Sequence, residues 1–275
     1  MLHCGRFKLS LEHPLIMGIV NVTPDSFSDG GLLPTASVAV EHALRLVDEG
    51  ADILDIGGES TRPGAKPVPT GRELERIVPV LEALHGLGVP LSVDTQKPEV
   101  MVAAIRAGAD MINDVNALQA EGALDAVAAS SVALCLMHKQ GEPQTMQQEP
   151  DYKNVVAEVR EFLAVRIAAA LAAGVTHERL LVDPGFGFGK SLRHNLLLLK
   201  HLDRLDALGA PVLAGLSRKS MLGVITGRGV GERVHASVAA AVLAVMKGAR
   251  ILRVHDVRAT RDALKVIKAV EREYE

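Results

Sequence analysis

Three side chains that accept hydrogen bonds, those of Asp94, Asn113 and Asp183, stand at the ends of short apolar runs. Carboxylate and amide oxygens gathered at one cavity would suit a guanidine-like or aminopyrimidine edge, which presents several N–H donors. The last of these three residues, Asp183, lies in LVDPGFGFGK, residues 181–190, where glycines allow a close backbone approach and a phenylalanine ring could stack on a flat heterocycle. The spacing of these glycines matches neither common nucleotide-loop motif. The stretch therefore predicts a heterocycle site rather than a phosphate cradle, with a plain strand-to-helix turn as the alternative.

A second group of residues could bind an anion. Arg253 and His255 are two residues apart on a predicted strand, so both side chains should lie on the same face and could share one anion. Arg62 and Asn21 also stand after predicted strands and complete a separate group of donors. Lys219 comes between the two groups in chain order, at a predicted helix start where a cation is unfavourable, which favours a role in ligand binding. The two groups predict a ligand with one donor-rich end and one anionic end.

Eight apolar runs, each followed by a helical pattern, should position these residues. The runs are LIMGIVN, ADILDIGG, VPLSVDT, ADMINDV, SVALCLMH, RLLVDPG, APVLAGLS and ARILRVHD. Continuous apolar runs are typical of strands buried on both faces, and their number predicts an α/β fold, a (β/α)8 barrel with its active site at the C-terminal ends of the strands. No linker or shift in composition divides residues 1–275, which predicts a single domain. A doubly wound open sheet is the alternative, because its units look the same locally.

Two loops are longer than ordinary connections. Residues 23–33 and 59–69 follow the first two predicted strands and carry glycines or prolines. At a barrel mouth such loops are candidates for lids that exclude water from a reactive intermediate, although plain connections remain the alternative. After the second loop, Thr70 and Glu73 predict a capping box at the start of a helix.

Composition excludes several classes of protein. Hydrophobic residues make up 48% of the 275 residues, charged residues make up 23%, and the net charge of -3 argues against a nucleic-acid partner held by bulk electrostatics. Cys4 and Cys135 lie far apart in the sequence, so neither a disulfide framework nor a cysteine metal site is indicated. The N-terminal stretch lacks a long apolar region, and no apolar run is long enough to span a bilayer. We expect a cytoplasmic protein without a membrane partner.

Taken together, the motifs resemble a known family. IMGIVNVTPDSFSDGG, ADILDIGGESTRPGA, LSVDT, INDV, LMHKQGEPQTMQ, LLVDPGFGFGK, GLSRKSMLG and RVHDV resemble bacterial dihydropteroate synthases in order and spacing, over almost the whole chain. The resemblance implies a transferase of folate biosynthesis. Such an enzyme condenses 6-hydroxymethyl-7,8-dihydropterin diphosphate with 4-aminobenzoate and releases diphosphate.

The resemblance also implies roles for individual residues. The pterin would be bound by Asp94, Asn113, Met137, Asp183, Phe188 and Lys219. The diphosphate would be bound by Asn21, Arg62, Arg253 and His255, with Asn21 also binding Mg²⁺. The 4-aminobenzoate site, which sulfonamides are expected to share, would include Phe27, Thr61, Pro63 and Ser220. Catalysis would depend on Asp94, Lys219, Arg253 and His255.

Some features of the family are left open by the sequence. Gln96, Asn116 and Lys139 depart from the residues expected there, and because Gln96 and Asn116 could alter the rim of the site, the response to substrate analogues and sulfonamides stays open. Family members are commonly homodimers, and the apolar segment Ala236 to Met246 could supply an interface.

Two other functions compete with the one the resemblance implies. A methyltetrahydrofolate-dependent methyltransferase barrel would bind a pterin but needs no diphosphate site, so Arg62, Arg253 and His255 argue against it. A non-catalytic pterin-binding paralogue would be signalled by loss of a loop motif or of Lys219, and both are present.

Overall fold

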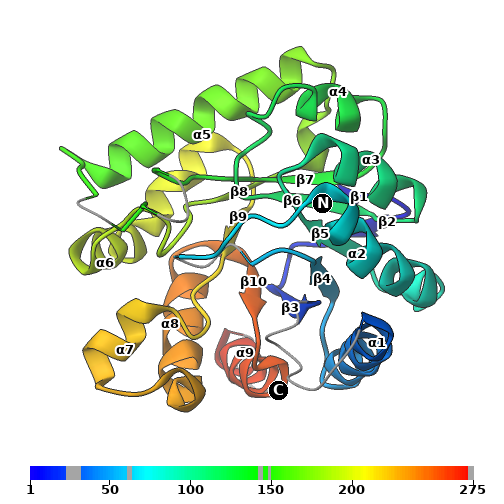
Figure 1. Ribbon diagram of the computed structural model, residues 1–275. Coiled ribbons are helices and arrows are strands. Elements are labelled where there is room, and N and C mark those ends of the chain that lie inside the picture. Colours follow the sequence, from blue (N-terminus) through cyan, green and yellow to red (C-terminus); the bar gives the residue numbers. More distant parts are fainter. Residues whose placement is uncertain (23–31, 61–63, 142–144, 148–149, 272–275) are drawn as a thin grey trace.

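Eight parallel strands close into a barrel, and helices form an outer ring around it (Figure 1). The computed structural model of the protein describes residues 1–22, 32–60, 64–141, 145–147 and 150–271. The barrel strands are β3 (Leu15–Asn21), β4 (Ile53–Gly57), β5 (Leu91–Asp94), β6 (Met111–Asp114), β7 (Ala133–Met137), β8 (Leu180–Asp183), β9 (Val212–Ala214) and β10 (Ala249–Val254). Because β10 pairs with both β9 and β3, the sheet has no open edge, so the barrel prediction is confirmed and the open-sheet alternative is wrong.

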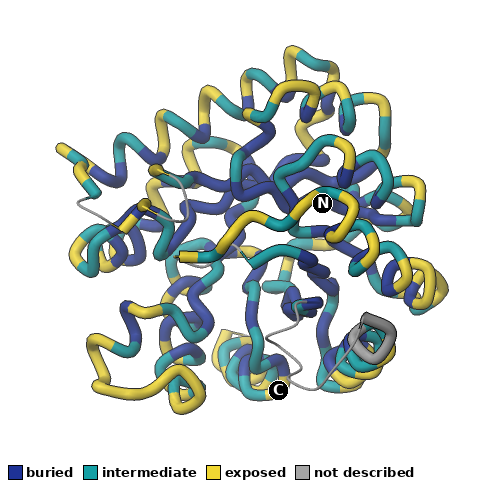
Figure 2. Tube along the Cα trace, viewed as in Figure 1, coloured by how far each residue is buried: buried dark blue, intermediate teal, exposed yellow. Residues whose placement is uncertain are grey.

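Helices connect successive strands on the outside of the barrel. The α-helices are α1 (Leu32–Asp48), α2 (Thr70–Leu84), α3 (Pro98–Arg106), α4 (Ala123–Ala128), α5 (Val155–Ala172), α6 (Leu192–Lys200), α7 (Ser220–Thr226), α8 (Val234–Met246) and α9 (Val257–Glu271). The short 3-10 helices are η2 (His177–Arg179), η3 (Leu202–Leu208) and η4 (Val230–Glu232). In Figure 2 the strands are buried almost throughout, whereas the helices alternate buried and exposed residues. The main core therefore lies between the strands and the helix ring.

Strand register brings polar residues to one level at the C-terminal end of the barrel. Asn21 pairs with Gly57, Gly57 with Asp94, and Asp94 with Asn113, across four neighbouring strands. Paired residues on neighbouring strands have their side chains on the same face of the sheet. Register thus gathers residues that are far apart in the sequence.

An antiparallel hairpin at the N-terminus, which no pattern in the sequence predicted, closes the opposite end of the barrel. Its strands are β1 (Leu2–Cys4) and β2 (Phe7–Leu9). Leu2 and Cys4 are buried against side chains that fill the barrel interior, namely Met17, Ile53, Met111, Ala133, Cys135, Leu181, Leu213 and Ile251. The hairpin therefore extends the inner core past the N-terminal ends of the strands.

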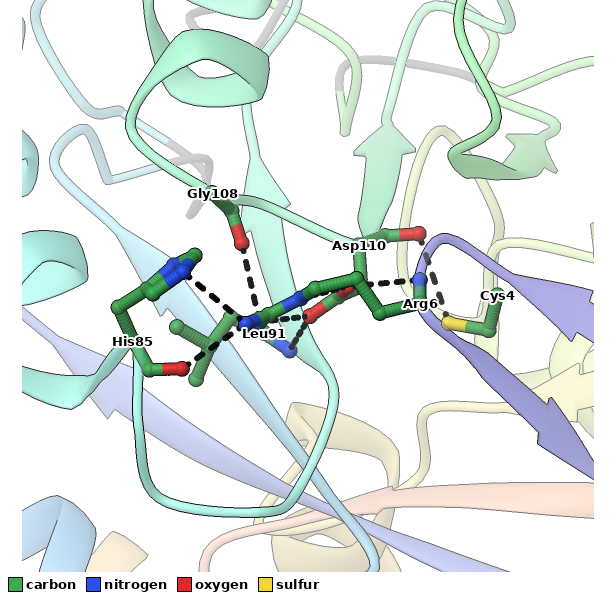
Figure 3. A network of polar contacts seen from close by, with 6 residues as sticks. All are labelled: Cys4, Arg6, His85, Leu91, Gly108 and Asp110. Atoms are coloured by element: carbon green, nitrogen blue, oxygen red, sulfur yellow. Dashed lines mark hydrogen bonds and ion pairs between the residues drawn. The ribbon is translucent and has the colours of Figure 1, made fainter.

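Arg6, in the hairpin turn, fastens the hairpin to the barrel (Figure 3). Its guanidinium donates to both carboxylate oxygens of Asp110, at 2.9 Å each, and to the His85 carbonyl oxygen at 2.9 Å. Asp110 is buried and also accepts a hydrogen bond from the backbone N–H of Leu91. One arginine thus satisfies a buried carboxylate that would otherwise be costly to bury.

The predicted capping box at the start of α2 is wrong. Thr70 is the first residue of the helix, Pro69 is the N-cap residue, and there is no side-chain cap. The Glu73 side chain is buried and accepts a hydrogen bond from Lys97 instead, because the ammonium offers a buried carboxylate a stronger partner than a backbone N–H. Among the described helices, none is long and apolar enough to cross a membrane.

Candidate active site

A cavity opens at the C-terminal ends of the barrel strands. It is lined by Asp94, Asn113, Val115, Met137, Asp183, Phe186, Phe188, Gly215, Lys219 and Arg253. All six residues expected at the pterin site are in this set. The structure therefore brings them together, as a ligand that contacts all of them would require.

A wider cavity adjoins the first and shares Asp94, Phe188, Gly215, Lys219 and Arg253 with it. Its further lining residues include Asn21, Glu59, Ser60, Ser217, Ser220 and His255. Asn21, Arg253 and His255 from the predicted anion-binding group therefore face a common space, and so does Ser220 from the predicted 4-aminobenzoate site. The remaining predicted residues, Phe27, Thr61, Arg62 and Pro63, lie outside the described residues.

Arg253 links the two groups that the sequence pattern predicted to be separate. Its Nε donates to Asp55 Oδ2 at 2.6 Å, and its terminal nitrogen donates to Asp94 Oδ2 at 2.7 Å. The prediction that the donor and acceptor groups are separate is therefore wrong for Arg253. The long side chain reaches across the barrel mouth, where two carboxylates compensate the cost of burying its charge.

Asp55 lines neither cavity, but it contacts two residues that do, and the sequence did not reveal this role. It is fully buried in β4 and accepts hydrogen bonds from Ser92 Oγ at 2.6 Å and Asn113 Nδ2 at 3.2 Å, besides that from Arg253. A carboxylate inside a strand buried on both faces was the available signal, since such a group needs several partners.

Burial changes the acid–base properties of two cavity carboxylates. Burial raises the pKa of Asp94 to about 7, and this rise is opposed by Arg253 and reinforced by Asp55. Burial also raises the pKa of Asp183, although a hydrogen bond from the Gly185 N–H at 2.7 Å opposes the change. Both acids are therefore poised to gain stabilisation from N–H donors of a bound ligand.

The loop after β8 places an aromatic ring beside a cation. Lys219 Nζ lies 4.2 Å from the centroid of the Phe188 ring, which is within the range of a cation–π contact. Gly187 has a φ of +82°, and a Cβ there would lie 3.3 Å from Lys219 Cδ. The absence of side chains on the loop glycines thus lets the loop approach Lys219 closely.

Contacts between the loop after β9 and the start of α9 orient the anion-facing side of the site. Ser217 Oγ lies 3.0 Å from His255 Nδ1 and also accepts the His255 N–H. Arg218, which has a φ of +57°, donates to both Asp256 oxygens, at 3.1 Å and 2.6 Å. This ion pair supports a left-handed backbone conformation that is unusual for arginine, next to Lys219.

A buried ion cluster anchors the beginning of the loop after β4. Lys97 donates to Glu73 and, at 2.7 Å, to Glu59 Oε2, while Glu59 Oε1 accepts the Val68 N–H at 2.7 Å. Glu59 also lines the wider cavity. The cluster therefore connects this part of the site to α2 and α3.

Two of the three departures from the expected family residues lie beside each other. Lys139 Nζ, in the segment after β7, is 3.5 Å from Gln96 Oε1, in the segment after β5. Neither residue lines the two cavities described above. They therefore leave the expected pterin-contacting residues unchanged.

The side chains at the cavities limit the kind of metal site that this chain can form. Within the described ranges, no group of three His, Cys, Asp or Glu residues could enclose a metal ion. Asn21 contributes one amide oxygen at the wider cavity, near Arg253 and His255. A single oxygen ligand suits Mg²⁺ that is held mainly by substrate phosphates and water.

Comparisons with known proteins agree with this geometry. Residues 17–255 match the family described as "Pterin binding enzyme". The dihydropteroate synthase of Neisseria meningitidis serogroup B is 53% identical over 273 residues, covering 97% of this chain and 96% of that protein. A structure of the Xanthomonas albilineans dihydropteroate synthase with 4-aminobenzoic acid is 60% identical and has a TM-score of 0.91, covering 96% of this chain and 95% of that one.

A further solved structure contains bound 7,8-dihydropteroate. The Burkholderia cenocepacia dihydropteroate synthase complexed with 7,8-dihydropteroate is 54% identical, with a TM-score of 0.91, and covers 99% of this chain and 96% of that one. Near-complete coverage in both directions, at more than half identity, accompanies the same closed barrel and a cavity with the expected residues. This chain belongs to the dihydropteroate synthase family of pterin-binding enzymes.

Proposed function

We propose that this protein joins 6-hydroxymethyl-7,8-dihydropterin diphosphate to 4-aminobenzoate, giving 7,8-dihydropteroate and diphosphate. The observation that carries the proposal is the pair of adjoining cavities. One is lined by hydrogen-bond acceptors and an aromatic ring, and the other by Arg253, His255 and Asn21. A ligand with a donor-rich heterocycle and an anionic end would span both cavities.

The pterin would occupy the inner cavity. Asp183 and Asp94 would accept its ring N–H groups, and Asn113 can both donate and accept. Phe188 offers an aromatic face, and Lys219 offers a cation to ring oxygen or nitrogen acceptors. Met137 completes the apolar part of the lining.

The diphosphate would occupy the wider cavity, which is lined by several cations, namely Arg218, Lys219, Arg233 and Arg253. Arg253 and His255 would stabilise the negative charge that grows on diphosphate as it leaves, and we expect Arg62 to join them. Mg²⁺ would be held by Asn21 and the diphosphate oxygens, and would supply further stabilisation of the leaving group's charge. The contacts of Arg253 with Asp55 and Asp94 hold its guanidinium at the junction of the two cavities.

This arrangement supports a dissociative substitution at the pterin methylene carbon. As the bond to the diphosphate oxygen breaks, positive charge develops on the methylene group and the electron-rich pterin ring, and the carboxylate of Asp94 would stabilise it. The neutral amine of 4-aminobenzoate then attacks that carbon and loses a proton. An isolable covalent adduct between substrate and protein would contradict this mechanism.

The second substrate would bind at the outer rim of the wider cavity. Ser220 lines this cavity at the start of α7, where a backbone N–H and the hydroxyl could receive the carboxylate. We expect Phe27, Thr61 and Pro63 to complete the site, which sulfonamides would share. Competition between a sulfonamide and 4-aminobenzoate in steady-state kinetics tests this placement.

We further infer that the chain forms one domain, acts in the cytoplasm and assembles as a homodimer. The family match over residues 17–255 supports a single domain. Leu243 and Met246 on α8 are 51% and 72% exposed, which supports an apolar contact surface there. Light scattering on the purified protein measures its molar mass, and the mass of a monomer would contradict the homodimer.

Diphosphate release tests the function directly. The purified protein is mixed with the pterin diphosphate and Mg²⁺, with and without 4-aminobenzoate, and both diphosphate and dihydropteroate are measured. We expect release coupled to product formation, abolished by chelation of Mg²⁺ and restored by adding it back. Asp94→Asn and Lys219→Ala should each remove most of the activity. Tight pterin binding without turnover would instead identify a non-catalytic paralogue.

A further inference from the structure

Lys190 is a buried cation outside both cavities, at the end of the loop that follows β8. Its side chain is 2% exposed. Its Nζ contacts His138 Nδ1 at 2.9 Å, donates to the Phe188 carbonyl oxygen at 3.0 Å and donates to the His138 carbonyl oxygen at 3.4 Å. The three N–H donors of one ammonium therefore meet three acceptors on two segments of the chain.

We propose that Lys190 is a positioning residue for pterin binding, which holds the loop after β8 so that the Phe188 ring stays against Lys219. The proposal rests on the pterin site inferred above. It adds a residue that contacts no substrate and acts through Phe188.

The loop needs such an attachment because it has few side chains of its own. Gly185 and Gly189 have φ angles of +68° and +62°, and a Cβ at either position would overlap the carbonyl oxygen of His138 or Gln140. Glycine allows this close contact between the loop and the segment after β7, but it also leaves the loop with the greatest backbone freedom. Hydrogen bonds from Lys190 across this contact restrict that freedom without adding bulk.

The acceptor on the other side of the contact is itself fixed. The His138 ring packs edge-on against Phe162, with centroids 4.9 Å apart and planes at 84°. Burial and the neighbouring Lys190 cation lower the pKa of His138 to about 3, so a neutral ring can accept the hydrogen bond at Nδ1. The support for Lys190 therefore reaches α5, well outside the pterin cavity.

Hydrogen bonds from Asn195 further fix the part of the loop that faces the cavity. The Gly187 N–H donates to Asn195 Oδ1 at 2.8 Å, and Asn195 Nδ2 donates to the Lys190 carbonyl oxygen at 3.2 Å. Lys190 and Asn195 thus hold the two sides of Phe188, whose ring faces Lys219 Nζ at 4.2 Å. Neither Lys190 nor Asn195 is among the described residues that line the two cavities.

The charge on Lys190 has no carboxylate bonded to it among the described residues. Burial lowers the pKa of Lys190 to about 7, an effect that Asp183 opposes and Lys219 reinforces. Burying a lysine ammonium whose hydrogen-bond partners are two carbonyl oxygens and an imidazole costs folding free energy. A positioning role gives a reason for that cost.

A double-mutant cycle with Lys190→Met and Phe188→Leu tests the proposal. We expect Lys190→Met to raise the KM for the pterin diphosphate about tenfold while the KM for 4-aminobenzoate changes less than about twofold. Because Lys190 acts through Phe188, the double variant should bind the pterin no more weakly than Phe188→Leu alone. Fully additive losses in the cycle would overturn the proposal.

Arg179→Met is the matched control. Arg179 is also a buried cation that donates to backbone carbonyl oxygens, those of Val127, Ala128 and Val132, but it precedes β8 at the far end of the barrel. The Arg179→Met variant should have a lower thermal stability than the unaltered protein and an unchanged KM for the pterin diphosphate. If Lys190→Met behaves in the same way, its role is structural and the proposal fails.

Two further measurements keep the test decisive. If Lys190→Met does not fold, Lys190→Gln, which keeps two N–H donors, is measured with the same readouts. Calorimetric binding of the pterin diphosphate reports on Lys190 without turnover. If the unaltered protein binds the pterin but releases no diphosphate, the proposed function fails and the Lys190 inference is still tested.

Discussion

At the residue scale, the site shows how buried charges are balanced before any ligand binds. Arg253 is shared between Asp55 and Asp94, and the two carboxylates raise the pKa of the guanidinium although burial alone would lower it. Asp94 remains the acid with a pKa raised to about 7. A small change in surroundings can therefore change its protonation state near neutral pH.

The raised pKa of Asp94 predicts a pH dependence of pterin binding. Below a pH of about 7 the carboxyl is protonated and loses acceptor capacity, so the affinity should fall as the pH decreases and level off above that value. Calorimetric titrations at pH values below and above about 7, at constant salt concentration, measure the affinity for the pterin. Asp94→Asn should bind weakly with little dependence on pH, and an inflection that survives in this variant would assign it to another group.

The close contact at Gly185 predicts a large loss of stability when a Cβ is added there. Gly185→Ala should prevent correct folding or lower the free energy of unfolding by more than about 3 kcal/mol, because the new Cβ would overlap the His138 carbonyl oxygen at a φ of +68°. Gly174→Ala is a control with a φ of +89° and no neighbour within 4 Å. It should lose only about 1 kcal/mol from conformational strain. Urea unfolding of both variants measures the difference, and equal losses would show that the contact with His138 does not matter.

At the scale of elements, the N-terminal hairpin illustrates how a short segment can stabilise a barrel. β1 and β2 are only three residues each, and a hairpin of that size is not stable alone. It gains stability by burying Leu2 and Cys4 in the barrel interior and by pairing Arg6 with Asp110 (Figure 3). The hairpin and the barrel therefore depend on each other.

Removing the arginine of this pair should destabilise the fold without changing the site. Arg6→Ala leaves the buried Asp110 carboxylate with fewer partners, so the free energy of unfolding should fall by about 2 kcal/mol, less than for a fully buried pair because Arg6 is 41% exposed. Lys8→Ala, at an exposed position of the same hairpin, should change it by less than about 0.5 kcal/mol. Denaturant titrations measure the loss of stability, and steady-state kinetics should give unchanged KM values for both substrates. Altered KM values would show that the two ends of the barrel are coupled.

At the scale of the whole molecule, the barrel separates a filled end from an open one. The inner core beneath the hairpin contains both cysteines, each of them free and buried, although Cys4 and Cys135 lie far apart in the sequence. Burial raises the pKa of both thiols, with Asp110 adding to the effect at Cys4 and Asp183 at Cys135. The opposite end holds the two cavities and the ionisable groups that line them.

This packing predicts that thiol reactivity reports on unfolding of the barrel. Both cysteines should react with a thiol reagent far more slowly than a free thiol, because the reactive thiolate is suppressed and access is blocked. The labelling rate should rise through the same denaturant range as the loss of circular dichroism. Rapid labelling of Cys4 alone in the native protein would show that the hairpin opens independently of the barrel.

The sequence by itself determined the class of fold and many residues of the site. Continuous apolar runs at regular spacing require strands buried on both faces, and polar residues after each run then meet at one end of the barrel. For this reason the order of residues along the chain is enough to group Asp94, Asn113 and Asp183, whereas the family resemblance was needed to assign Lys219 to the same site. The match of several motifs in order also identified the family, because such spacing is specific.

Only the tertiary structure decided which groups contact one another. Local patterns carry no information about a partner on a distant strand, so Arg253 bridging Asp55 and Asp94 could not be read from the chain. The hairpin was not predictable because its strands are too short to show a periodic pattern. Glu73 likewise fits a helix cap locally, but burial beside Lys97 gives its carboxylate a stronger partner. Sequence specified the chemistry present, while packing and register decided how its charges are shared.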